Sequence, residues 1–146
     1  MKIALLQLNT VVGDLAGNAD RIAAGVDEAV HYRPDLIVAP ELSLPGCPPP
    51  RDLLLQTGGF IARSLTVLGE LAADLRDAPP PVLVGFAEPN LTGTGRPLFN
   101  AAALLRDGAV SKTFRKALLS SGVFDEDRYF EPGGPGSRNP STSTGG

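Results

Sequence analysis

The chain has 146 residues, 42% of them hydrophobic and 20% charged, which is the composition of one globular domain and excludes a disordered chain. A formal net charge of −3 gives no indication of a nucleic-acid partner, and no apolar run reaches the length of a membrane span. One cysteine excludes an intramolecular disulfide, and one cysteine with one histidine excludes a zinc site of these ligands. The N-terminus lacks the pattern of a secretory signal, so we expect a cytoplasmic protein.

The first part of the chain alternates between strand and helix patterns. Residues 2–8 are apolar and predict a strand, and a helix capped by Asn18 or Asp20 follows to about residue 31. Residues 36–39 predict a second, buried strand that ends before Pro40, because proline has no N–H for the ladder. Strand, helix and strand in this order form a βαβ unit.

The second part predicts a change from parallel to antiparallel pairing. Proline excludes regular structure at residues 45–50, residues 52–56 predict a short helical turn, and residues 60–77 carry the clearest helical pattern. Asp107 and Gly108 between two apolar runs indicate a hairpin. The further strands are predicted at residues 82–87, 98–106 and 109–114. The sheet is therefore expected to be mixed.

The composition changes at Gly133. Residues 133–146 contain no large apolar side chain, so they cannot bury enough surface to offset the entropy lost on ordering. The sequence therefore predicts a folded domain over residues 1–132 and a disordered tail over residues 133–146.

Glu41 stands at the carboxyl end of the second predicted strand, where open α/β folds bind ligands. A poorly solvated carboxylate there suits general-base work, although by position alone a turn cap or a surface ion pair is the better interpretation. Residues 40–46, Pro-Glu-Leu-Ser-Leu-Pro-Gly, resemble the glutamate motif of the carbon–nitrogen hydrolase (nitrilase) superfamily. This resemblance implies that Glu41 is the general base of a Glu-Lys-Cys triad. Residues 49–55 resemble more narrowly the glutaminase domain of glutamine-dependent NAD synthetases.

A basic pair that ends in Lys116 follows the last predicted strand, and in isolation it is typical of a solvated edge strand. With the preceding residues 99–108 it resembles the segment that carries the catalytic lysine of the superfamily. The resemblance implies that Lys116 stabilises the oxyanion of the acyl intermediate. Residues 123–133 resemble the segment after this lysine in the synthetases, which implies that Glu126 is a supporting carboxylate. The alternative is a surface loop anchored by Phe124 and Tyr129.

The chain also departs from the family pattern. Residues 119–122 are one residue shorter than the Leu-Pro-x-Tyr stretch of the family and lack its tyrosine, which lines the glutamine pocket. Cys47 lies in a proline-rich loop that does not match the position of the family's nucleophile, so no nucleophile is assigned in this chain. The resemblance covers the first half of the glutaminase domain, and the nucleophile belongs to the second half.

The resemblance implies an α/β fold, namely part of a nitrilase-like α-β-β-α sandwich with both helices on one face of a mixed sheet. The opposite face would meet a second sheet, so strand residues such as Leu36, Ile37 and Val38 would be partly exposed. Glu41 and Lys116 should lie close together, because in the family both leave the same ends of neighbouring strands.

The function implied is hydrolysis of glutamine, which supplies ammonia for synthesis of NAD(+) from deamido-NAD(+). Glutamine would be the small-molecule substrate and the protein an oligomer, without nucleic acid or membrane as partners. ATP and magnesium would belong to a synthetase domain, so no cofactor is expected in this chain. The alternatives are a catalytically inactive fragment or a partner-binding half-domain. An amidase of another nitrilase branch is disfavoured by residues 49–55 and 123–130.

Overall fold

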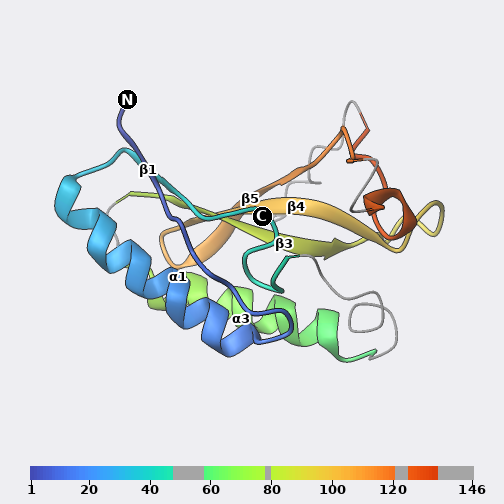
Figure 1. Cartoon of the computed structure of the whole chain (residues 1–146), viewed down its shortest axis with the longest axis horizontal. Helices are drawn as coiled ribbons and strands as arrows, with labels where there is room; N and C mark the ends of the chain where they lie inside the picture. The colour runs from blue at the N-terminus through green and yellow to red at the C-terminus, as the bar shows by residue number, and fades with distance from the viewer. Residues whose placement is uncertain (48–57, 78–79, 121–124, 135–146) are drawn as a thin grey trace, which may run out of the picture.

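The computed structural model describes residues 1–47, 58–77, 80–120 and 125–134. Within this part of the chain, five strands form one mixed sheet in the order β1-β2-β3-β4-β5, and α1 and α3 lie side by side on the same face of it (Figure 1). The predicted α/β class, with a mixed sheet and its helices on one face, is therefore confirmed.

The sheet begins with parallel strands and continues as an antiparallel meander. β1 is parallel to β2 and β2 to β3, whereas β3, β4 and β5 are successively antiparallel. In chain order the elements are β1 (Ile3–Leu5), α1 (Leu15–Ala29), η1 (Val30–Tyr32), β2 (Leu36–Val38), α3 (Phe60–Asp74), β3 (Val82–Pro89), β4 (Leu98–Arg106), β5 (Ala109–Arg115) and η2 (Glu126–Arg128).

β1 is shorter than the strand predicted over residues 2–8. Its last recorded bond to β2 is from Leu6 N–H to Val38 O, at 2.9 Å. β2 ends at Val38, and Pro40 beyond it has no N–H to continue the pairing with β1. The length of β1 is thus limited by its neighbour and not by its own apolar run.

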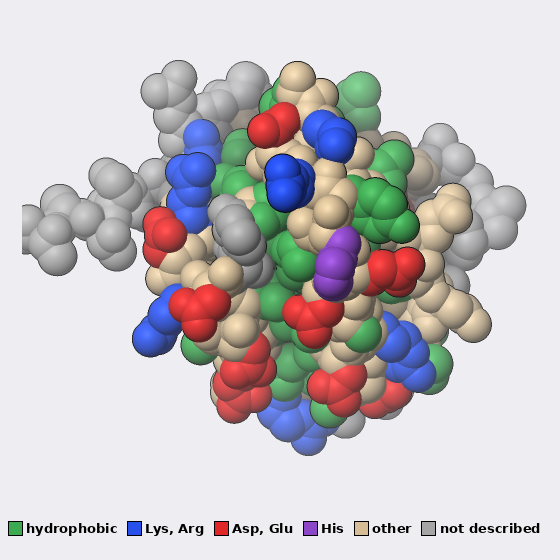
Figure 2. Space-filling view, turned by 90° about the vertical axis from the view of Figure 1, so that its left-hand side faces the viewer, with side chains coloured by type: hydrophobic (Ala, Val, Ile, Leu, Met, Phe, Trp, Pro, Cys, Tyr) green, Lys and Arg blue, Asp and Glu red, His purple; other side chains and the backbone are tan. Residues whose placement is uncertain are grey.

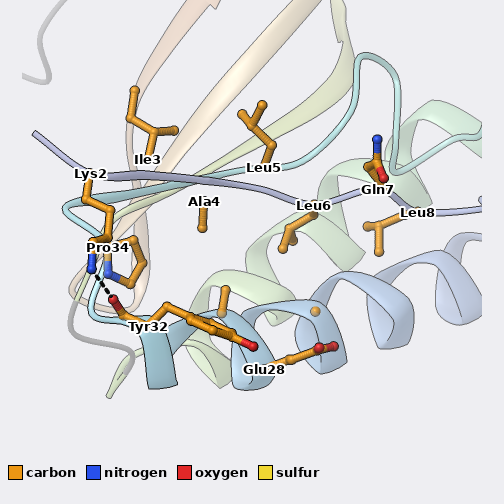
Figure 3. Close-up of a pocket in the computed structure, with 12 residues that line it drawn as sticks. Lys2, Ile3, Ala4, Leu5, Leu6, Gln7, Leu8, Glu28, Tyr32 and Pro34 are labelled. Atoms are coloured by element: carbon orange, nitrogen blue, oxygen red, sulfur yellow. Dashed lines mark hydrogen bonds between the residues drawn. The ribbon is translucent and has the colours of Figure 1, made fainter.

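Side chains of the β1 segment alternate between the two faces of the sheet. Figure 3 shows Ala4, Leu6 and Leu8 pointing toward α1, while Ile3 and Leu5 point away from it. A groove of about 430 Å³ lies between this segment and α1. Figure 2, which views this end of the molecule, shows hydrophobic surface between acidic and basic side chains.

In the described part of the chain, no helix is long and apolar enough to cross a membrane.

The N-terminus of α1 differs from the prediction. Asp14 is the N-cap, and its carboxylate accepts a hydrogen bond from Gly17 N–H at 3.0 Å, so the helix starts at Leu15 and Asp20 lies inside it. Asn18 is fully buried instead of capping: it accepts from Val11 N–H at 2.8 Å and donates to Leu44 O at 2.9 Å. The prediction of Asn18 or Asp20 as the cap was therefore wrong, since Asp14 supplies the acceptor one turn earlier.

The hairpin between β4 and β5 is confirmed. Asp107 and Gly108 have φ angles of 53° and 79°, the left-handed values that a two-residue hairpin turn of type I′ requires at both positions.

The two faces of the sheet differ in burial. Ile37 is fully buried, whereas its neighbours Leu36 and Val38 are half-buried, so the predicted partial exposure holds for these two and was wrong for Ile37. The reason is strand alternation, which turns Ile37 toward the core against α1 and α3 and its neighbours toward the open face. On that open face Leu5 is 73% and Phe114 45% exposed.

The predicted domain boundary falls inside the described residues. Gly133 is buried, and its N–H donates to Lys116 O at 2.9 Å, so the packed region extends past residue 132. Residues 135–146 of the predicted tail, the predicted turn at residues 52–56 and the proposed anchor Phe124 lie outside the described residues.

Candidate active site

The backbone around Glu41 crosses closely over β3. Ala39 N–H donates to Leu83 O at 2.8 Å, and after Pro40 the chain turns with Leu42 at φ 49°, a left-handed conformation that a leucine rarely adopts. The turn lies on Gly85, where a Cβ atom would come within 3.0 Å of the backbone of residues 40–42. A glycine in β3 is therefore a condition for the position of Glu41.

Lys116 is held through its backbone on both sides. Its N–H donates to Asn100 O at 2.8 Å, and its carbonyl accepts from Gly133 N–H at 2.9 Å. The preceding residue, Arg115, forms two hydrogen bonds of 2.8 and 2.9 Å to the carboxylate of Glu88. These contacts fix the end of β5 and therefore the direction in which the lysine leaves it.

The three predicted site residues meet at one point. Lys116 Nζ lies 2.7 Å from Glu41 Oε1 and 2.9 Å from Glu126 Oε2. The expected proximity of Glu41 and Lys116 is thus confirmed. The strands they follow are not neighbours, however, because β3 and β4 lie between β2 and β5.

Small residues in the intervening strands make this long reach possible. Gly85 of β3 is paired with Ala102 of β4, and both line a hollow of about 350 Å³ that also includes Glu41 and Lys116. With little side-chain volume here, the turn that carries Glu41 lies over β3, and the two charged groups meet beside Asn100 of β4. The hollow opens on the sheet face opposite the helices.

Asn100 of β4 is a site residue that sequence reasoning did not assign. It is 3% exposed, and its Nδ2 donates to Glu41 Oε1 at 2.6 Å and to Glu126 Oε1 at 2.7 Å. The sequence carried a signal, since asparagine is depleted in strands and here interrupts an apolar run. A buried amide needs partners, and both of its N–H groups find them at the carboxylates.

Comparison with known proteins identifies the family. The carbon–nitrogen hydrolase family matches residues 2–145. The chain belongs to this family. It is 37% identical over 134 residues to a glutamine-dependent NAD(+) synthetase of Thermotoga maritima, a match covering 91% of this chain and 22% of that protein.

Solved structures agree with this assignment. The glutamine-dependent NAD+ synthetase of Acinetobacter baumannii, in complex with ADP, has a TM-score of 0.75 and 31% identity, over 91% of this chain and 24% of that one. An amidase of the nitrilase superfamily from Nesterenkonia has a TM-score of 0.72 at 24% identity, which shows the fold, over 92% of this chain and 48% of that one. The chain thus spans less than a quarter of the Acinetobacter synthetase and about half of the amidase.

The charges of this carbon–nitrogen hydrolase site influence one another. Burial alone would lower the pKa of Lys116, but hydrogen bonds to Glu41 and Glu126 outweigh it and raise that pKa. Burial alone would raise the pKa of Glu126, but Ser120 N–H at 2.6 Å, Lys116 and Asn100 together hold it below its usual range. The lysine is therefore charged and Glu126 ionised at neutral pH.

The two carboxylates differ in exposure. The side chain of Glu126 is 10% exposed and that of Glu41 52%. The expectation that Glu41 is poorly solvated was therefore wrong for this structure, because its strand-end position lies on the open face of the sheet. The buried carboxylate is suited to holding Lys116, and the exposed one is accessible from the hollow.

Cys47 is exposed and lies in the field of the same carboxylates. Partial desolvation and then the charges of Glu41 and Glu126 raise the pKa of its thiol, while Lys116 acts in the opposite direction. A raised pKa leaves little thiolate at neutral pH, which disfavours nucleophilic attack.

The depressed pKa of Glu126 predicts an acid-dependent loss of stability. The stabilisation is present above the ordinary glutamate pKa of about 4.3 and is lost as the pH falls through the lower pKa of the folded protein. We expect Glu126→Gln to cost about 2 kcal/mol at neutral pH, with the difference shrinking as the pH falls. Urea unfolding of both proteins across acid pH measures this; Glu70→Gln, at an exposed position of α3, is the control. A constant difference at all pH values would contradict it.

Proposed function

We propose that this chain forms the glutamate- and lysine-bearing part of a glutamine amidohydrolase site that supplies ammonia for NAD(+) synthesis from deamido-NAD(+). The observation that carries the proposal is the contact of Lys116 Nζ with Glu41 and Glu126, at 2.7 and 2.9 Å, beside a hollow of about 350 Å³. The names of the synthetase relatives support glutamine as the substrate.

In the proposed reaction Glu41 acts as the general base. It takes the proton of a cysteine thiol, and the thiolate attacks the amide carbon of glutamine to give a tetrahedral oxyanion. Glu41 then returns the proton to the leaving nitrogen, so ammonia departs and a thioester remains. Water, deprotonated by the same carboxylate, hydrolyses the thioester to glutamate and regenerates the thiol.

Lys116 is proposed to stabilise the oxyanion. An ammonium group has three N–H donors, and in the described residues two of them are bonded, to Glu41 and Glu126. The third is available for a developing negative charge. A compact point charge suits this task, because the oxyanion needs charge more than the planar fork of a guanidinium.

We propose that the thiol in this scheme is not Cys47 and is supplied by a segment outside residues 2–145, which match the family. Cys47 has a raised pKa and lies in a loop that does not correspond to the family's nucleophile. This observation also favours the second candidate, a catalytically inactive half-domain that binds a partner. In the complete enzyme we propose oligomerisation, a cytoplasmic location, and ATP and magnesium in the synthetase part.

We expect the purified chain alone to release no ammonia from glutamine, because no positioned thiolate forms the thioester. Co-expression with a chain that covers the remaining part of a synthetase relative should restore release, as measured with a coupled glutamate dehydrogenase assay. In this pair Glu41→Gln should abolish the activity, whereas Glu70→Gln, on the exposed side of α3, should not.

Two results would decide against this scheme. Ammonia release by the chain alone that disappears in Cys47→Ser would make Cys47 the nucleophile. A soluble co-expressed pair that binds but releases no ammonia would favour the partner-binding half-domain.

A further inference from the structure

The four carboxylate oxygens of Glu41 and Glu126 are unequally occupied. Both oxygens of Glu126 accept hydrogen bonds: Oε1 from Asn100 at 2.7 Å, and Oε2 from Lys116 at 2.9 Å and Ser120 N–H at 2.6 Å. Glu41 Oε1 accepts from Asn100 at 2.6 Å and Lys116 at 2.7 Å. Among the described residues, Glu41 Oε2 is the remaining oxygen, and it has no recorded donor.

The Asn100 amide connects the two carboxylates and has one possible orientation. Carboxylate oxygens accept hydrogen bonds, so the amide nitrogen and not the amide oxygen must face both of them. Its two N–H groups are then both used. At 3% exposure the amide is buried, and these two hydrogen bonds fix its orientation.

This arrangement restricts where a proton can be placed. An oxygen that already faces N–H donors cannot take a proton on that side without bringing two hydrogens together. Glu41 Oε1 and Glu126 Oε2 each accept two hydrogen bonds, and Glu126 Oε1 accepts one inside the buried part of the site. The fourth, Glu41 Oε2, belongs to the more exposed of the two carboxylates.

We propose that Asn100 is a positioning residue that makes Glu41 Oε2 the one proton-accepting oxygen of the site. The role of Asn100 in catalysis rests on the proposed function, but the contacts of its amide with the two carboxylates are testable without activity. Without the amide, Glu41 Oε1 keeps Lys116 as a donor but loses Asn100, so the carboxylate is held less firmly. Either oxygen of Glu41 could then take the proton, and the orientation of the base toward its substrate proton would no longer be fixed.

Other charged groups near the cluster do not replace the amide. Arg115 is engaged with Glu88, and Arg128 on η2 pairs with Asp125 at 3.0 Å. Cys47 is close enough for the two carboxylates to raise its pKa, but a neutral thiol is only a weak donor. Lys116 bonds Glu41 Oε1 and Glu126 Oε2, so among the described residues Asn100 is the one recorded donor to Glu126 Oε1.

The first test is titration of Glu126 in the full 146-residue chain. Carbon-13 NMR of labelled glutamate carboxyls, assigned with Glu126→Gln, should place Glu126 below the usual glutamate range. Asn100→Leu should move its midpoint upward, because a donor to the ionised form is lost. Asn18→Leu is the matched control: it also removes a fully buried amide with several hydrogen bonds, but one that bonds to Val11 and Leu44 and not to the carboxylates. An unchanged Glu126 midpoint in folded Asn100→Leu would overturn the proposal.

A second variant covers the case in which Asn100→Leu does not fold. In Asn100→Asp the introduced carboxyl faces two others, which raises its own folded pKa, so its charge destabilises at high pH and the protonated form is tolerated at low pH. Relative to the unmodified chain, this variant should gain stability as the pH falls from about 8 to about 5. A stability deficit independent of pH indicates a merely structural amide and overturns the proposal.

Activity in the co-expressed pair separates this inference from the proposed function. Asn100→Leu should lower kcat for ammonia release at least about tenfold with little change in KM, and move the acid limb of the pH profile. A kcat and pH profile equal to those of the unmodified pair would overturn the positioning role. If the unmodified pair is inactive, the proposed function fails, while the Glu126 titration and the pH dependence of Asn100→Asp stability still test whether the amide holds the two carboxylates.

Discussion

Replacing Lys116 by methionine is expected to reduce ammonia release by the co-expressed pair roughly 100- to 1,000-fold, mainly in kcat. Methionine keeps the length and the apolar stem of lysine and removes the charge. The oxyanion then loses its electrostatic partner in the transition state, whereas the bound ground state loses little, so KM should change much less. Steady-state kinetics with glutamine measure both constants.

The matched control is Lys112→Met in β5, the strand that Lys116 follows. Lys112 is exposed, and its ammonium lies 5.1 Å from the ring centre of Phe114, away from the two carboxylates. This substitution removes the same charge from β5 and should leave kcat within about twofold, because surface charges contribute little. If both variants lose activity equally, the role assigned to Lys116 is wrong.

Gly85→Ala is expected to destabilise the protein by about 3 kcal/mol and to disable the site at the same time. A Cβ at this position would come within 3.0 Å of backbone atoms of residues 40–42, and backbone cannot rotate away as a flexible side chain can. The turn that carries Glu41 must then lift off β3. Thermal and urea unfolding give the stability, and a smaller upward shift of the Lys116 pKa would report the displaced Glu41, because its hydrogen bond is one cause of that shift.

Gly69→Ala is the matched glycine control. Gly69 lies at an exposed position inside α3, and a Cβ there meets no atom within 4 Å. Alanine favours the helix, so this variant should gain about 0.5–1 kcal/mol. Opposite signs for the two substitutions are the expected result. A Gly85→Ala protein as stable as the unmodified chain would show that the turn adapts without cost.

Features set by near neighbours in the sequence could be predicted. The β4–β5 hairpin follows from Asp107 and Gly108, and the α3 helix from its apolar periodicity, although it ends at Asp74 and not at residue 77. Features set by another segment could not. The length of β1 depends on where β2 turns away, and Asn18 does not cap α1 because it bonds to Leu44, 26 residues away.

The same distinction applies to the site. Glu41, Lys116 and Glu126 were found from motifs, because each lies in a recognisable local segment. Asn100 and Gly85 act only through what lies against them: two carboxylates from other segments in one case, and a crossing backbone in the other. Neither partner can be inferred from composition or spacing, since the strand order that brings them together is a tertiary property.

The sheet topology also divides the site by distance along the chain. Asn100, Lys116 and Glu126 come from one continuous stretch, with Lys116 and Glu126 ten residues apart, whereas Glu41 is 75 residues from Lys116. β2 is registered with β3 at Ile37 and Val38 alone, while β3 and β4 pair along their full lengths. The short pairing of β2 with β3 is therefore the link in the sheet between Glu41 and the other three site residues. During folding, the meander can assemble an ammonium with one carboxylate and an amide early, and closure of the long βαβ crossover adds the base last.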